Sequence, residues 1–260
     1  MSQVLVSVDG SVATVRLNDP DSMNALSASM GADLEAAVET LCEDTSIRVL
    51  VITGTGRAFS AGGDVQSFYD NRDDPRDVMQ ATLDGLHGAV ERMLDAPFPT
   101  IAAINGVVAG AGMGIAMATD LAIAVDSAVF TMAYTGIGVS PDGSSTFFLP
   151  RIVGTRRAME LILTNRRLTA DEALELGLVN SVVAPEEFDE AVASLAGRLS
   201  VGATKAYVRA RSLIRSSLAS DPGTQMAAEA EAILAAADTD DFYEGVSAFI
   251  EKRRPGFTGS

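Results

Sequence analysis

The chain contains two stretches with the same order of features, VLVITGTGRAFSAGG at residues 49–63 and TIAAINGVVAGAGMG at residues 100–114. Each begins with an apolar run typical of a buried strand, continues through a glycine and a short loop, and ends in a cluster of small residues. Features that recur after about 50 residues indicate a structural repeat. The repeat predicts an α/β fold wound as a coil of ββα turns, and argues against a doubly wound sheet.

The segments around the repeat extend this prediction. Alternating apolar residues in VLVSVDG and VATVRLN, with a glycine between them, predict an N-terminal hairpin. Ser27 and Thr169 precede helical patterns and are typical N-cap residues. Strand and helix patterns alternate only as far as Leu149, and helical patterns follow. We therefore expect a ββα core over residues 1–195 and a C-terminal helical region over residues 196–260.

Composition excludes several classes of function. The 260 residues are 47% hydrophobic, which allows a substantial core. Because 35 acidic residues oppose 19 basic ones, the formal net charge of −16 would repel nucleic acids. Cys42 and His87 are the single cysteine and histidine, too few for a typical zinc site, and no metal is expected. A lone cysteine fits a reducing compartment, so we expect a cytoplasmic protein.

The uncharged, largely apolar stretch at residues 101–119 reaches the ~18 residues of a membrane-spanning helix. It also contains four glycines and Asn105, at which it divides naturally. We interpret it as a buried strand, a glycine-rich loop and a buried helix. The N-terminus has neither a basic segment nor an apolar one of the signal-peptide kind. No membrane association is expected.

The repeat carries two glycine loops, residues 60–64 (SAGGD) and residues 110–114 (GAGMG). Small residues let a backbone approach a ligand closely, and the second loop also opens a helix whose free N–H groups favour negative charge. Two such loops, brought together, would form an oxyanion hole from two backbone N–H groups. Close packing alone is the alternative explanation. GAGMG does not match the dinucleotide pattern G-x-G-x-x-G, and there is no phosphate-binding GK[ST] sequence.

A single carboxylate, Asp142, lies in the segment GVSPDGSST at residues 138–146. Pro-Asp-Gly is a typical turn sequence, because proline presets φ and glycine accepts a positive φ. These nine residues alone favour a turn over a catalytic base. The remaining motifs of the chain change that balance.

Five motifs occur in a recognisable order: NALS (24–27), GRAFSAGGD (56–64), AAINGVVAGAGMG (102–114), ALELGLVNSVV (173–183) and EGVSAFIEKRRPGF (244–257). In this order they resemble the enoyl-CoA hydratase/isomerase (crotonase) superfamily. The resemblance implies a ClpP-like spiral of ββα turns with a C-terminal helical trimerisation region. It also implies a homotrimer or dimer of trimers, and an acyl-CoA thioester substrate. Coenzyme A is then part of the substrate, and no separate cofactor is expected.

The same resemblance implies roles for individual residues. The N–H groups of Gly63 and Ala111 would hold the thioester oxygen as an enolate, and Ala61 and Asp64 would line the CoA site. The region from Phe249 to Lys252 of a neighbouring subunit would reach toward the CoA. The family often has a cation before NAL, where this chain has Asp21.

The catalytic positions depart from those of a hydratase. A hydratase uses two glutamates to place water on a double bond, and these would fall at Gly114 and Tyr134, so ordinary hydration is disfavoured. Asp142 occupies another acid position of the family. The chain resembles the phenylacetate-pathway enoyl-CoA isomerases, in which this Asp moves a proton while Tyr134 would shape or hydrogen-bond the acyl pocket.

Two alternatives remain open. The chain also resembles 4-chlorobenzoyl-CoA dehalogenase, which implies hydrolytic dehalogenase or thioesterase chemistry with Asp142 as nucleophile and His87 as base. A surface position on a helix is the other explanation for His87. The third reading is a non-catalytic acyl-CoA-binding relative. Over both alternatives, the residues favour an isomerase of acyl-CoA or fatty acid metabolism.

Overall fold

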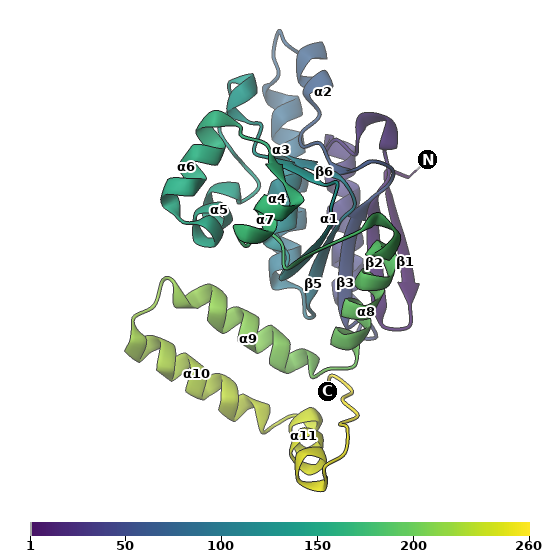
Figure 1. The fold of residues 1–260 in the computed structure, drawn as a ribbon, viewed down its shortest axis with the longest axis vertical. Coiled ribbons are helices and arrows are strands. Elements are labelled where there is room, and N and C mark those ends of the chain that lie inside the picture. Colours follow the sequence, from purple (N-terminus) through teal and green to yellow (C-terminus); the bar gives the residue numbers. More distant parts are fainter. Residues whose placement is uncertain (1) are drawn as a thin grey trace.

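The computed structural model describes residues 2–260 (Figure 1). The chain begins with an antiparallel hairpin of β1 (Val4–Asp9) and β2 (Val12–Leu17), which turns at Gly10 with φ of 58°. Along β2, Ala13 and Val15 point into the core, while the intervening Thr14 faces the other side of the sheet. The hairpin predicted from the alternating pattern is confirmed.

The strands form two sheets. The six-stranded sheet has the order β1-β2-β3-β5-β7-β10, and the four-stranded sheet has the order β4-β6-β8-β9. The further strands of the first sheet are β3 (Val49–Gly54), β5 (Thr100–Ile104), β7 (Leu121–Val125) and β10 (Ser181–Val183). The strands of the second sheet are β4 (Ala58–Ser60), β6 (Val107–Ala109), β8 (Val129–Thr131) and β9 (Leu168–Thr169).

The path of the chain between the two sheets is the predicted coil. β3, β5 and β7 each lead directly into a strand of the other sheet, namely β4, β6 and β8. Strands that correspond in successive turns pair in parallel, so that Val51 lies beside Ile101 and Ala58 beside Val107. The sequence interval of the repeat is therefore the length of one turn of the coil.

Within the described residues, eight helices accompany the two sheets. They are α1 (Ala28–Glu43), α2 (Val65–Asp70), α3 (Arg76–Asp95), α4 (Ala111–Ala118), α5 (Ser145–Val153), α6 (Thr155–Thr164), α7 (Ala170–Glu175) and α8 (Phe188–Ser200). Short 3-10 turns lie at Pro20–Ser22, Thr135–Ile137 and Pro185–Glu187. Both predicted caps are present, because Ser27 accepts from Met30 N–H and Thr169 forms a capping box with Glu172.

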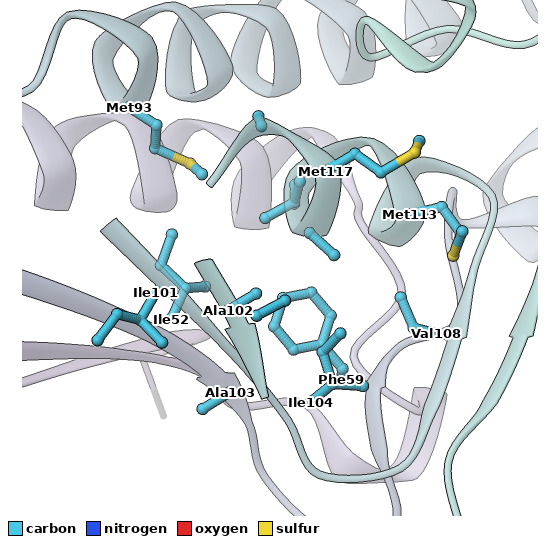
Figure 2. Close-up of a cluster of buried hydrophobic side chains, with 14 of the residues drawn as sticks. Ile52, Phe59, Met93, Ile101, Ala102, Ala103, Ile104, Val108, Met113 and Met117 are labelled. Atoms are coloured by element: carbon cyan, nitrogen blue, oxygen red, sulfur yellow. The ribbon is translucent and has the colours of Figure 1, made fainter. Parts of the chain in front are cut away.

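The core lies between the sheets and helices α1, α3 and α4. Figure 2 shows Phe59 among Ile104, Ala102 and Val108, with Met113 and Met117 of α4 above the strands. All eight residues of α4 are buried. Helix α4 is therefore held from every side, and its first residue, Ala111, has a fixed position.

The uncharged stretch at residues 101–119 forms β5, β6 and α4, which confirms its interpretation as a strand, a loop and a helix and adds the short strand β6. Within residues 2–260, no helix combines the length and the apolar character that crossing a bilayer requires.

Three helices follow the core: α9 (Thr204–Ser217), α10 (Pro222–Ala236) and α11 (Asp240–Glu251). In Figure 1 they lie beneath the main body. The expected boundary between residues 195 and 196 falls inside α8, because α8 packs on the sheet and Ala196 is buried. The chain leaves the core only at residues 201–203, between α8 and α9.

A cluster of charges attaches α9 to the core. Asp120 accepts from Arg211 at 3.2 Å and from Arg215 at 3.0 Å, and both guanidinium groups also donate to backbone carbonyls of residues 94–98 and 118. The Asp120 carboxylate accepts from Thr100 as well. Since these three charged side chains are largely buried, the cluster fixes the direction in which the C-terminal helices leave the core.

Candidate active site

The first glycine loop is held by buried polar side chains. Asn24, fully buried with φ of 57°, donates through its amide to the carbonyls of Thr55 and Ala58. Ser60 donates to Asn24 O at 2.9 Å and accepts from Gly62 N–H at 3.2 Å. Because buried polar groups with satisfied hydrogen bonds rigidify a loop, residues 60–64 have a defined path.

The two glycine loops lie against each other. Gly62 has φ of +97°, and a Cβ atom on it would lie 3.0 Å from Ala109 O and 3.4 Å from Ala111 N. A Cβ on Gly112 would lie 2.7 Å from Ser60 O. Glycine is therefore required at both positions, at Gly62 by conformation as well as by space.

The N–H groups of Gly63 and Ala111 have no protein acceptor within residues 2–260. Gly63 forms a parallel bridge with Leu26, whose hydrogen bonds use Gly62 O and Asp64 N–H and leave Gly63 N–H pointing away from Leu26. Ala111 N–H opens α4, whose N-cap, Gly110, has no side chain to cap it. Among residues 2–260, neither N–H donates to another protein group. Such donors, with the helix dipole behind Ala111, stabilise negative charge on an oxygen.

Tyr134 connects the glycine loops to Asp142. A Cβ on Gly110 would lie 4.0 Å from Cζ of Tyr134, so the phenol ring lies beside the start of α4. The Tyr134 hydroxyl donates to Oδ1 of Asp142 at 2.6 Å. Tyr134 is only 8% exposed, while Asp142 is half-buried. A carboxylate, a phenol and two free N–H groups thus occupy one region of the molecule.

Asp142 stands at the first position of a tight turn. Ser145 N–H donates to Asp142 O at 2.9 Å, and the two residues between them, Gly143 and Ser144, have φ of 54° and 62°. Two successive positive φ values define a type I′ turn. The turn predicted at this segment is confirmed, but proline precedes it, and a serine as well as a glycine adopts the left-handed conformation. A serine held there is strained.

Burial and the neighbouring carboxylate act together on Tyr134. Burial, and then the negative charge of Asp142, raise the pKa of the Tyr134 hydroxyl well above its ordinary value of about 10. The phenol therefore keeps its proton at every pH near neutrality. It serves as a hydrogen-bond donor to Asp142 and not as a second base.

The residues predicted to bind CoA lie in two places. Ala61 and Asp64 belong to the first glycine loop, and Asp64 also caps α2, accepting from Ser67 N–H at 3.1 Å. Phe249 is 86% exposed at the end of α11, and Lys252 is exposed beside it in a left-handed conformation. Nearby Arg253 forms ion pairs with Glu244 and Glu251, which offset its positive charge.

Among residues 2–260, His87 shares no hydrogen bond with Asp142. His87 is exposed on α3, and within residues 2–260 it forms no hydrogen bond or ion pair with another side chain. Its flanking glycines have another use: a Cβ on Gly85 would lie 2.7 Å from the backbone of Gly31, and one on Gly88 would lie 2.3 Å from the Glu35 side chain. These glycines let α3 pack closely on α1.

Three residues of this region have roles that the sequence did not predict. Asn24 and Ser60 position the first loop, and the ring of Phe68 lies 3.7 Å from where a Cβ of Gly63 would be. Asn24 and Ser60 lay inside the motifs NALS and GRAFSAGGD, and the tolerance of asparagine for positive φ was a usable signal. Phe68 gave no such signal, because an apolar residue at its position in a helical pattern is equally typical of a helix packed on the core.

The chain is similar to known proteins over most or all of its length. The family model described as Enoyl-CoA hydratase/isomerase matches residues 7–260. The chain is 35% identical over 260 residues to 1,2-epoxyphenylacetyl-CoA isomerase of Escherichia coli (strain K12), which covers 100% of this chain and 99% of that protein. It is 41% identical over 197 residues to 4-chlorobenzoyl coenzyme A dehalogenase-2 of Arthrobacter sp, which covers 74% of this chain and 70% of that protein.

A solved structure described as an enoyl-CoA hydratase from Polaromonas sp. JS666 matches with a TM-score of 0.93 and 31% identity, covering 98% of this chain and 99% of that one. The α/β crotonase fold expected from the motifs is thereby confirmed. Names of isomerase, dehalogenase and hydratase all occur among these relatives, so the family is shared while the reaction differs. The chain belongs to the enoyl-CoA hydratase/isomerase family and is a crotonase-fold enzyme of acyl-CoA chemistry.

Proposed function

We propose that this chain is an enoyl-CoA isomerase in which Asp142 is the single acid/base. The observation that carries the proposal is the 2.6 Å hydrogen bond between Tyr134 and Asp142, beside the start of α4. One carboxylate next to free N–H donors suits removal of a proton α to a carbonyl, because the donors stabilise the enolate that forms.

The reaction follows from these parts. A 3-enoyl-CoA binds with its thioester oxygen against the N–H groups of Gly63 and Ala111. The Asp142 carboxylate removes a proton from C2, and the electron pair of that C–H bond delocalises through the double bond onto the thioester oxygen as a dienolate. Protonated Asp142 then returns the proton to C4, and the double bond moves to C2–C3. Tyr134, a donor throughout, holds the carboxylate in place and shapes the acyl pocket.

The alternatives have less support. A hydratase needs two carboxylates about its water, and Gly114 and Tyr134 stand where the family's glutamates fall. The hydrolytic reading needs His87 as base, and His87 is exposed on α3 without contact to Asp142. The relative named 1,2-epoxyphenylacetyl-CoA isomerase, similar over the full chain, favours isomerase chemistry.

The proposed assembly is a homotrimer, which can pair further as a dimer of trimers. Helix α10 has no buried residue, and large apolar side chains of α10 and α11 are exposed, among them Ile233, Leu234, Phe249 and Ile250. Contact with neighbouring subunits would cover this surface. It would also bring Phe249 and Lys252 of one subunit to the CoA bound by its neighbour. Ala61 and Asp64 of the subunit that binds this CoA would line the site.

The proposal is tested with a 3-enoyl-CoA in D2O. Conjugation is followed by ultraviolet absorbance and deuterium incorporation by mass spectrometry, for the wild type, for Asp142→Asn and for Asp126→Asn, an exposed carboxylate after β7. We expect conjugated product from the wild type and from Asp126→Asn, and none from Asp142→Asn. Binding of CoA esters without turnover in all three proteins would contradict the proposal and favour the non-catalytic reading.

A further inference from the structure

The hydroxyl of Ser145 is buried beside the candidate site without a hydrogen-bond partner. Ser145 is the first residue of α5, directly after the Asp142 turn, and it is fully buried. Among residues 2–260, no polar atom pairs with its Oγ atom. An unpaired buried hydroxyl destabilises a protein, and the large majority of such groups are paired. The Ser145 hydroxyl therefore needs an acceptor close by.

Two helices enclose the end of the turn at which this hydroxyl lies. A Cβ on Gly114 of α4 would lie 3.3 Å from Oγ of Ser145. On the side of α3, Cδ2 of Leu86 lies 3.2 Å from where a Cβ on Gly143 would be. Neither a glycine nor a leucine has a side chain that accepts a hydrogen bond. The side-chain acceptor must therefore come from the Tyr134–Asp142 pair.

The phenolic oxygen of Tyr134 offers that acceptor. Its proton is donated to Asp142, and within residues 2–260 no hydrogen bond uses the lone pairs of this oxygen. Both groups approach one carbonyl, because Ser145 N–H donates to Asp142 O at 2.9 Å and the Tyr134 oxygen lies 3.5 Å from the same atom. Burial and then Asp142 raise the pKa of the Tyr134 hydroxyl, whereas the Ser145 side chain lowers it, as a donor to the phenolic oxygen does.

We propose that Ser145 is a positioning residue, whose hydroxyl donates to the Tyr134 oxygen so that Ser145, Tyr134 and Asp142 form one chain of hydrogen bonds. This inference rests on the proposed isomerase function. Donation to the phenolic oxygen makes the Tyr134 hydroxyl a stronger donor, because hydrogen bonds in series polarise one another. The Asp142 carboxylate is then held more firmly while it removes and returns the substrate proton. Ser145 acts only through Tyr134 and transfers no proton.

The test is a double-mutant cycle of Ser145→Ala and Tyr134→Phe, with Ser200→Ala as the control. Ser200 is a buried serine of α8 that donates to Gly197 O at 3.0 Å. Ser145→Ala should lower the kcat of isomerisation by about 3- to 10-fold, the effect of losing one neutral hydrogen bond, and leave KM unchanged. Ser200→Ala should keep the kcat of the wild type. In Tyr134→Phe, which lacks the acceptor, Ser145→Ala should cause no further loss.

Urea unfolding tests the same hydrogen bond without the reaction. The four proteins of the cycle are compared by the urea concentration at the midpoint of unfolding. If Ser145 pairs with Tyr134, Ser145→Ala should lower the midpoint of the wild type and leave that of Tyr134→Phe unchanged or raised. If Ser145 is unpaired, Ser145→Ala should leave the midpoint unchanged or raised in both backgrounds, because the cost of burying the hydroxyl is removed.

The outcomes separate the inference from the function on which it rests. An unchanged kcat in Ser145→Ala, with a midpoint that does not fall, would overturn the inference while leaving the isomerase function in place. Equal losses of kcat from Ser145→Ala with and without the Tyr134 hydroxyl would overturn it as well, because the serine would then act elsewhere. Absence of isomerisation in the wild type would instead contradict the proposed function, and the urea cycle would still decide whether the hydrogen bond forms.

Discussion

The phenolic hydroxyl of Tyr134 donates a 2.6 Å hydrogen bond to the carboxylate of Asp142. Tyr134 itself is fixed by burial beside Gly110 at the start of α4. The carboxylate is therefore oriented by a group that also lies beside Gly110, the residue before Ala111. This relationship makes the Tyr134 hydroxyl the first group to remove.

Tyr134→Phe should lower the kcat of isomerisation by about 10- to 100-fold, because a hydrogen bond to a charged group contributes about 1.5–3 kcal/mol. The KM for the acyl-CoA should change little, since the ring that shapes the pocket remains. Steady-state kinetics measures both values. Tyr243→Phe, which removes a hydroxyl from α11, is the control, and an equal loss in the control would contradict a positioning role for Tyr134.

The raised pKa of Tyr134 makes stability fall at high pH. Above the ordinary tyrosine pKa of about 10, the unfolded chain releases the proton that the folded protein retains. Fewer protons bound to the unfolded state mean that the free energy of unfolding decreases as pH rises, by up to about 1.4 kcal/mol per pH unit from this residue. Urea unfolding should show a shallower decline for Tyr134→Phe above pH 10, and equal slopes for the two proteins below it.

The first glycine loop offers a matched pair of substitutions. Gly62→Ala should reduce stability by roughly 1–3 kcal/mol and abolish most activity, because position 62 has a positive φ and opposes Ala109 O. At Gly63 an added Cβ meets only the ring of Phe68 at ordinary contact distance. Gly63→Ala should fold as the wild type does. Equal melting temperatures of the two variants would show that Gly62 is not constrained.

The charge cluster under α9 predicts a large loss of stability. Asp120→Asn leaves the largely buried Arg211 and Arg215 facing each other without a carboxylate, which should cost about 3–5 kcal/mol. Glu39→Gln breaks the half-exposed pair with Arg92 and should cost less than about 1 kcal/mol. Urea unfolding compares them, and light scattering reports whether Asp120→Asn also changes the assembly. A small effect of Asp120→Asn would mean that apolar contacts alone hold α9.

His87→Gln should leave the isomerisation rate unchanged, because the imidazole is exposed on α3. The same variant assayed for thioester hydrolysis and for dehalogenation of an aryl-CoA addresses the hydrolytic alternative. Hydrolysis by the wild type that disappears in His87→Gln would favour that alternative over isomerisation.

Much of the fold followed from local pattern. The alternation in residues 4–17, the apolar runs at residues 49–54 and 100–104, and the caps Ser27 and Thr169 each act over a few residues, and all are present in the structure. The two glycine loops suggested an oxyanion hole only if they converge, with close packing as the alternative explanation. Gly62 and Ala109 do lie in contact.

The sequence by itself determined the hairpin, the buried strands at residues 49–54 and 100–104, the two helix caps, the family motifs and the candidate groups Gly63, Ala111 and Asp142. Tertiary structure alone decided which groups meet. It left His87 exposed, although the preceding residue of α3, Leu86, packs against the Asp142 turn. It also brought Gly114 against Gly143 and Tyr134 against Asp142. Such contacts depend on how closely separate backbones approach, and that distance is set by the packing of whole elements, which no short pattern encodes.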